Sequence, residues 1–169
     1  MESTQAIIEN DELKRILHEV KDPEIPTISV VELGVLREAR FDNDKLKVVI
    51  TPTYSGCPAM DVMEHDILAK LKEYGYENID VERRLSPAWT TDWMDETAKE
   101  KLLESKIAPP IGNAFEVNKQ FKVFNFPTIP CPYCGSKETE MKSEFGTTAC
   151  KSLYQCKSCG QPFDYFKVH

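Results

Sequence analysis

Apolar and polar residues recur along the first hundred positions in patterns that predict a small α+β domain. From Asn10 to Lys21 four apolar side chains fall at steps of three and four, which is the spacing of one helix face. The two prolines that follow cannot continue a helix. Residues 33–41 and 45–53 predict two strands, and the Asp-Asn-Asp turn between them predicts an antiparallel hairpin.

A second and longer helical pattern follows the hairpin, from Met60 to Tyr74, with apolar residues again three or four positions apart. Gly75 directly after it suits the left-handed conformation at a helix end. Residues 77–85 predict a third strand and residues 92–106 a last helix. This order predicts a mixed sheet flanked by helices on a short chain.

The composition changes near residue 109, where prolines become frequent. We therefore expect an α+β domain over residues 1–108, a Pro-containing linker over 109–127, and a β-rich module over 128–169. The last segment is too short to bury a large core, so a bound metal would supply much of its folding energy.

The net negative charge of the chain disfavours one class of function, nucleic-acid binding. The chain carries a net charge of -7, and residues 1–108 alone hold 14 Lys/Arg against 23 Asp/Glu, a net of -9. Binding to nucleic acid depends on Lys and Arg that neutralise phosphates, so this excess of acid disfavours it. No apolar run approaches the roughly 18 residues of a membrane span. The acidic, amphipathic start is unlike a signal peptide, which predicts a cytoplasmic protein.

Five of the six cysteines lie near the end of the chain, and four of them form two Cys-x-x-Cys-Gly motifs separated by 21 residues. Each motif can place two thiolates on one metal, and the glycine permits the tight turn around it. The pattern predicts a closed four-sulfur site of the zinc-ribbon kind, although iron uses the same ligands. The four predicted ligands are Cys131, Cys134, Cys156 and Cys159.

Cys150 is a fifth cysteine inside the predicted ribbon. It is either a small buried residue on a ribbon strand or a free thiolate near the metal, and the spacing does not decide between them. We keep it as a secondary thiol candidate.

Cys57 stands apart from the other five, in the stretch TPTYSGCPAMD between a predicted strand and a predicted helix. Pro58 suits the first helical position, which makes Cys57 the predicted N-cap. The helix dipole and free amides there favour thiolate, as in reactive or metal-binding cysteines. A packed structural cysteine is the alternative. In either case a single thiol cannot close a metal site alone.

Two further motifs admit both a structural and a functional interpretation. Asp22-Pro23-Glu24 offers two carboxylates that can bind metal or perform acid–base chemistry, but such a stretch also caps turns. Trp89 and Trp93 lie four residues apart, and such a pair either anchors a helix in the core or forms a partner surface.

Together these motifs resemble the PaaD family of bacterial phenylacetate degradation, the D component of the phenylacetyl-CoA epoxidase system. The resemblance rests on DPEIPT, TPTYSGCPA, PAWTTDWM and the ribbon EFGTTACKSLYQC, and it extends from about residue 10 to the end. Residues 10–106 also resemble the wider metal–sulfur cluster assembly domain family, through Asp22-Pro23-Glu24 and residues 51–58.

The resemblance implies an accessory protein, not an enzyme, that matures iron–sulfur clusters or iron centres of the epoxidase and reductase components. It implies that Cys57 transiently binds a cluster or iron, with Asp22 and Glu24 shaping that site, and that a homodimer or a partner supplies the other ligands. The sequence has no ExxH helix pair and no GxGxxG loop, the motifs expected of a di-iron oxygenase or its flavin reductase. A structural or regulatory subunit of the complex is the alternative.

Overall fold

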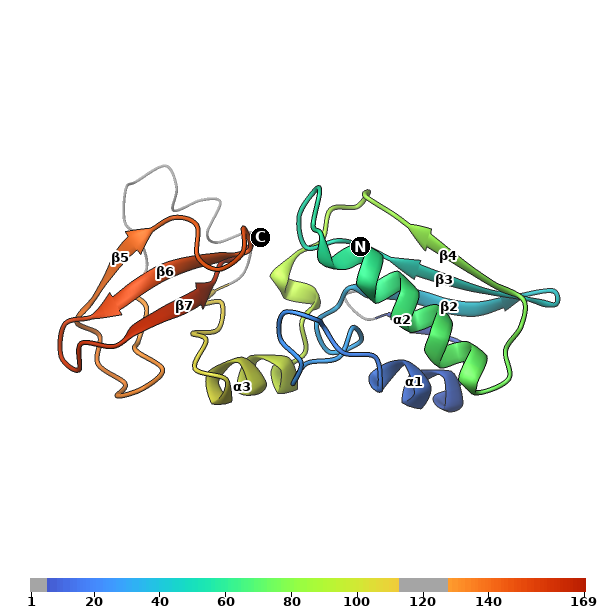
Figure 1. The fold of residues 1–169 in the computed structure, drawn as a ribbon, viewed down its shortest axis with the longest axis horizontal. Helices are drawn as coiled ribbons and strands as arrows, with labels where there is room; N and C mark the ends of the chain where they lie inside the picture. Colours follow the sequence, from blue (N-terminus) through green and yellow to red (C-terminus); the bar gives the residue numbers. More distant parts are fainter. Residues whose placement is uncertain (1–5, 113–127) are drawn as a thin grey trace. The chain divides into compact units, whose positions relative to one another are not determined.

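The chain folds into two compact units in the computed structural model, which describes residues 6–112 and 128–169. The first unit comprises Met1–Trp89 and Trp93–Ala98, and the second unit comprises Thr90–Asp92 and Lys99–His169 (Figure 1). Residues 113–127 of the predicted linker lie outside the described residues. The domain limits proposed from the sequence remain a prediction.

The first unit is built on a mixed four-stranded sheet of order β1-β2-β3-β4. The central pair, β2 and β3, is the predicted antiparallel hairpin, and each outer strand runs parallel to its neighbour. Helices and strands together confirm the α+β class. The strands span Ile7–Ile8 (β1), Leu36–Asp42 (β2), Lys45–Ile50 (β3) and Ile79–Arg83 (β4).

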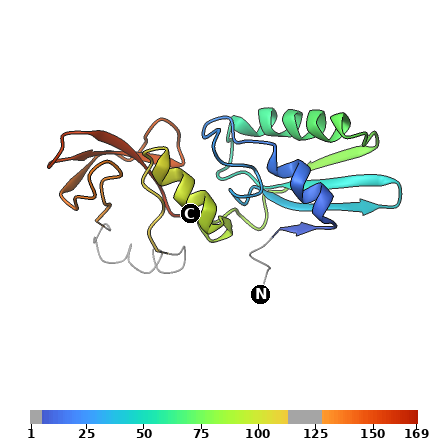
Figure 2. The same ribbon diagram turned by 90° about the horizontal axis from the view of Figure 1, so that it is seen from below.

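Helices α1 (Asp11–His18) and α2 (Ala59–Glu73) contact each other and bury their apolar faces, and α2 runs alongside the strands (Figure 2). Asn10 caps α1 by accepting a hydrogen bond from the N–H of Leu13 at 2.9 Å. Gly75 follows α2 with a φ of 90°, as the sequence predicts. No helix in residues 6–112 or 128–169 is long and apolar enough to cross a bilayer.

The sequence prediction differs from the structure at three places. The sequence pattern does not predict strand β1, and β2 begins later than expected, at Leu36. The predicted last helix is two elements, a 3-10 turn at Thr91–Trp93 (η1) and α3 at Glu96–Glu104. The interruption arises because Asp95 acts as a new N-cap, accepting from the N–H of Ala98 at 2.7 Å.

The second unit carries an antiparallel three-stranded sheet of β5 (Thr139–Ser143), β6 (Lys151–Cys156) and β7 (Pro162–Phe166). Ala108 pairs with the outer edge of β7 through two backbone hydrogen bonds. The core is small, and two of its members are cysteines. It comprises Ala108, Ile129, Cys131, Tyr154, Cys156, Phe163 and Tyr165.

Candidate metal centres

Four cysteines of the second unit converge on one point. Their sulfur atoms all lie within 4.8 Å of one another. The Sγ atoms of Cys131 and Cys159 are 3.7 Å apart, and those of Cys134 and Cys156 are 3.6 Å apart. A tetrahedral metal with bonds of about 2.3 Å to sulfur places its ligands about 3.8 Å from one another. The cluster therefore fits a four-sulfur metal site.

Two matching backbone turns hold these cysteines. The N–H of Gly135 donates to the carbonyl of Cys131 at 2.8 Å, and the N–H of Gly160 donates to that of Cys156 at 3.0 Å. Both glycines have positive φ, 73° and 76°, which a residue with a Cβ rarely adopts. The glycine after each Cys-x-x-Cys pair is thus required by the turn.

Backbone amides point at the sulfurs. The pKa of Cys156 is lowered to about 6, foremost because the N–H of Cys159 donates to its sulfur. At Cys134 the N–H of Ser136 acts to lower the pKa, but neighbouring cysteine sulfurs raise it to about 12. A metal cation would relieve this crowding because it binds all four groups as thiolates. The amides two positions after each cysteine that donate to sulfur belong to Tyr133, Ser136, Ser158 and Gln161.

The site is sealed on one side only. Cys131 and Cys156 are 2% and 1% exposed, whereas Cys134 and Cys159 are exposed. Four sulfurs complete a tetrahedron and leave no open position for a substrate, which is the pattern of structural metal sites.

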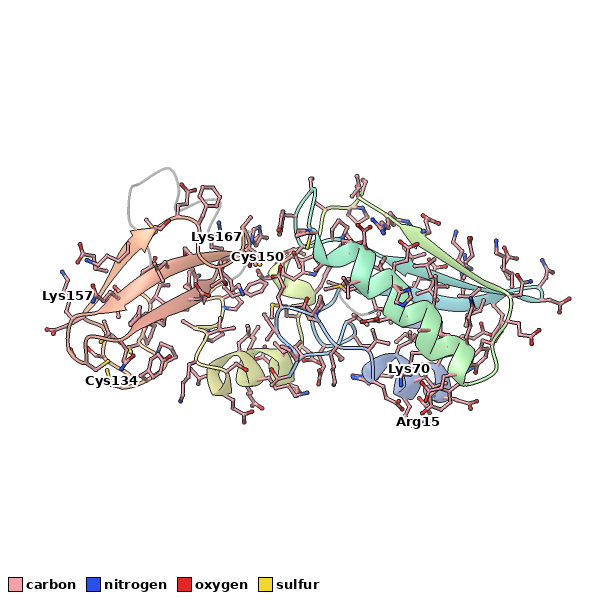
Figure 3. All side chains as sticks on the ribbon, in the orientation of Figure 1. Arg15, Lys70, Cys134, Cys150, Lys157 and Lys167 are labelled. Carbon is pink, nitrogen blue, oxygen red and sulfur yellow. The ribbon has the colours of Figure 1, made fainter. Side chains whose placement is uncertain are left out.

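Cys150 lies elsewhere in the second unit. Figure 3 places it at the opposite end of the ribbon sheet from Cys134. It is 4% exposed, and its Sγ is 3.0 Å from the Oγ1 of Thr148. Cys150 is therefore not a member of the four-sulfur cluster.

Cys57 lies in the turn between β3 and α2 of the first unit. The helix begins at Ala59 and its N-cap is Pro58, so the predicted cap at Cys57 is wrong by one residue. Pro58 already has helical dihedrals, φ -69° and ψ -21°, because its ring favours them. The sulfur of Cys57 still accepts a hydrogen bond from the N–H of Ala59.

The surroundings of Cys57 outweigh the effect of the helix start on its thiol. Burial, foremost, raises the pKa of this thiol, and the Ala59 N–H only partly offsets it. The negative charge of Glu24 raises the pKa further, while the side chains of Thr53 and Tyr54 hydrogen-bond to the sulfur and act to lower it. Sequence reasoning missed these two side chains, although both lie within four residues of Cys57.

The two carboxylates of the Asp-Pro-Glu loop have different roles. Asp22 is 5% exposed and accepts from the N–H groups of Glu24 and Ile25 at 2.8 and 2.7 Å, so it holds the loop in shape. Glu24 is half-buried, and its charge acts on Cys57. The loop thus places Glu24 close enough to influence the thiol across 33 positions of sequence.

The tryptophans anchor the segment that follows β4. Trp89 is 4% exposed and donates from Nε1 to the carbonyl of Leu33 at 3.2 Å. Trp93 is half-buried, with the guanidinium of Arg37 3.7 Å from its ring centroid. Of the two interpretations, the geometry favours core anchoring.

Comparison with known proteins first defines the class. Residues 10–82 match the family model described as iron–sulfur cluster assembly protein, and residues 117–167 match the PaaD zinc beta ribbon domain. A crystal structure of a domain of unknown function, DUF59, from Bacillus anthracis aligns with a TM-score of 0.51 and 27% identity, covering 54% of this chain and 89% of that one. The chain thus joins an iron–sulfur assembly domain to a zinc ribbon.

Two full sequences identify the particular family. A protein of Escherichia coli strain K12, provisionally named as the D subunit of 1,2-phenylacetyl-CoA epoxidase, is 41% identical over 92% of this chain and 91% of its own length. An Fe-S protein maturation auxiliary factor of Porphyromonas gingivalis W83 is 31% identical over 52% of this chain and 85% of its own length. The chain belongs to the PaaD family, that of the phenylacetyl-CoA epoxidase D component.

Proposed function

We propose that this protein is a non-catalytic accessory factor that delivers iron or an iron–sulfur cluster to the phenylacetyl-CoA epoxidase system. It acts in the cytoplasm on the epoxidase or reductase components. The proposal is supported by the iron–sulfur assembly match and by the names of the relatives, one an epoxidase subunit and one a maturation factor.

The observation that carries the proposal is the environment of Cys57. One sulfur is surrounded by the hydroxyl-bearing residues Thr53 and Tyr54, by the N–H of Ala59, and by the charge of Glu24. The thiol stays protonated until a cation arrives, because burial and Glu24 both oppose thiolate. A cation reverses that balance, since it attracts both the thiolate and the carboxylate.

Cys57 and Glu24 leave the ligand set of iron incomplete. Asp22 is assigned the role of shaping the site, because its Oδ1 accepts hydrogen bonds from two loop amides. The missing ligands then come from the recipient protein or from a second copy of the chain. Transient, shared ligation suits a carrier, because a full set of resident ligands would retain the cargo.

The ribbon has a different role in this proposal. Its four cysteines hold a structural zinc ion, although iron suits the same donors. Zinc there would stabilise the second unit and supply no chemistry to the cargo. The acidic character of residues 1–108 makes a nucleic-acid partner unfavourable.

The first test replaces Cys57 by Ser. We expect a folded, zinc-loaded variant that no longer supports epoxidase activity in cells and takes up less iron and sulfide during anaerobic reconstitution. Cys150→Ser is the matched control, because it removes a thiol that belongs to neither centre. Full epoxidase activity with Cys57→Ser would refute the role of Cys57.

A second candidate function, that of a stoichiometric structural subunit, is favoured by the name of the Escherichia coli relative, which calls that protein a subunit. Purification of the assembled epoxidase with and without this chain separates the two functions. A structural subunit stays bound and is needed at every turnover, whereas a maturation factor is dispensable once the metal centres are in place.

A further inference from the structure

An open groove of about 490 Å³ lies in the first unit, beside the Asp-Pro-Glu loop. It runs between the chain just after α1, the loop itself and the second half of α2. This volume is within the range of sites that hold peptide side chains or small ligands. The groove is lined by Glu19, Val20, Lys21, Asp22, Pro23, Pro26, Asp66, Ala69, Lys70 and Glu73.

A network of hydrogen bonds fixes one wall of this groove. Lys70 lies between two carboxylates, with its Nζ 3.5 Å from Glu19 and 2.9 Å from Glu73. The hydroxyl of Tyr74 donates to Glu19 at 2.8 Å, and Arg15 contacts the same carboxylate at 3.3 Å. Figure 3 shows Arg15 and Lys70 beside each other at the ends of α1 and α2. These contacts link α1, the chain just after it and α2 along one side of the groove.

The groove has an excess of negative charge. Its lining holds four carboxylates, at Glu19, Asp22, Asp66 and Glu73, against two ammonium groups. Hydrogen bonds lower the pKa of Glu19, that from Tyr74 foremost, so this carboxylate stays ionised. Asp66 is half-buried on α2 and, within residues 6–112 and 128–169, makes neither a hydrogen bond nor an ion pair. The C-terminal end of α1 adds a partial negative charge at the mouth.

The remaining lining is apolar, and most of it is exposed, Val20 being the buried member. Pro23, Pro26 and Ala69 all face solvent. A surface that combines small apolar residues with fixed carboxylates is complementary to an extended segment bearing Lys or Arg, whose carbon stem packs while its charge meets the acid.

We propose that this groove docks a Lys- or Arg-bearing segment of the protein that receives the metal, with the basic side chain against Asp66. The proposal rests on the delivery function proposed above and names the recognition surface that it needs. Asp22 and Pro23 line the groove, and Glu24, the next residue, acts on Cys57. A recipient held in the groove would thus be bound beside the loop that carries the Cys57 partner.

The test uses the full-length protein with pentalysine as the probe and pentaglutamate as its counterpart. In two-dimensional NMR we expect pentalysine to shift the amide signals of Lys21, Ala69 and Lys70 saturably, and pentaglutamate to leave them unchanged. Asp66→Asn should weaken pentalysine binding about two- to five-fold, as expected for one charge contact at the surface, and Asp66→Lys should weaken it further.

Glu77→Lys is the matched control, because it makes the same change in net charge as Asp66→Lys at an exposed position outside the groove lining. Equal weakening by both variants, or shifts spread over the acidic surface, would show general charge attraction and overturn the proposal. Cys57→Ser should bind pentalysine normally. Metal uptake by Cys57→Ser tests the delivery proposal, and pentalysine binding by the Asp66 variants tests the docking proposal. Either proposal can therefore fail without the other.

Discussion

At the scale of single residues, Glu24 and Cys57 form a charge relationship that depends on what else is present. Without a cation the carboxylate opposes ionisation of the thiol, and burial, the larger effect, acts in the same direction. With a cation present, the carboxylate and the thiolate can bind the same positive charge, so Glu24 no longer opposes ionisation of the thiol. One glutamate can therefore keep the thiol unreactive and still favour metal binding.

Glu24→Gln separates these two effects. Removal of the negative charge lowers the pKa of Cys57, so alkylation by iodoacetamide at pH 8 should become roughly two- to five-fold faster, the effect of a charge contact worth up to about 1 kcal/mol. In the wild type the midpoint of alkylation against pH should lie above that of an unstructured cysteine, because the folded-state pKa is raised.

Iron uptake by Glu24→Gln should fall while its alkylation rises, and peptide mapping by mass spectrometry assigns the alkylated cysteine. Glu64→Gln, which removes a carboxylate on α2 that is paired with Arg83, is the control and should change neither rate nor uptake. A slower alkylation of Glu24→Gln would contradict this assignment of charges.

The identities of the candidate residues at Cys57 follow from the sequence, but their protonation does not. The position of Cys57 near a helix start correctly predicts an amide hydrogen bond to its sulfur. The direction of its pKa depends on burial and on Glu24, which only the folding of a distant loop brings near. The local sequence predicts the Ala59 amide hydrogen bond, which favours thiolate. It does not predict the burial of the sulfur, the larger effect, which favours the protonated thiol.

At the scale of elements, Gly34 determines how the turn before β2 fits against the tryptophan segment. Its φ is 75°, and a Cβ there would lie 2.5 Å from the carbonyl oxygen of Trp93. The neighbouring Leu33 accepts the hydrogen bond from Trp89. The turn and the segment therefore approach so closely that only glycine fits between them.

Gly34→Ala should destabilise the protein by about 3 to 4 kcal/mol, since it adds a steric clash to the cost of a left-handed residue. Gly56→Ala is a matched control, because Gly56 also has a positive φ, 86°, but a Cβ added there would meet no atom within 4 Å. It should cost about 1 to 2 kcal/mol. Urea denaturation measures both, and equal losses would show that the contact with Trp93 is unimportant.

Elements with long periodic patterns could be predicted, and elements that depend on distant partners could not. Helices α1 and α2 and the β2–β3 hairpin have internal signals of periodicity, cap and turn. Strand β1 has two residues, Ile7 and Ile8, and exists only because β2 accepts it at its edge. The last predicted helix is interrupted at Asp95, whose side chain caps a new helix start that the apolar pattern does not reveal.

At the scale of the whole molecule, the two units differ in how they are stabilised. The first unit buries side chains from a four-stranded sheet and from helices α1 and α2, so we expect its core to form without a metal. The second unit has a small core in which Cys131 and Cys156 are also candidate metal ligands. Its metal site and its hydrophobic core thus share two residues, Cys131 and Cys156, so the metal and the core depend on each other.

Removal of the ribbon metal should therefore unfold one unit and spare the other. Treatment with a strong chelator should collapse the amide signals of β5, β6 and β7 while those of β2 and β3 persist. Cys134→Ser should reproduce this pattern, and Cys150→Ser should retain both the metal and the spectrum. Ribbon signals that survive complete metal loss would contradict the expected dependence.

The unequal exposure of the four sulfurs affects the affinity for a metal and the rate of metal exchange differently. Cys131 and Cys156 belong to the core, so their bonds to a metal determine how much stability the ion confers. Cys134 and Cys159 are exposed to solvent, so an incoming ligand can take the place of one of them while the metal keeps four ligands, which Cys134→Ser does not allow. An ion that is held tightly by one pair can thus be exchanged rapidly through the other.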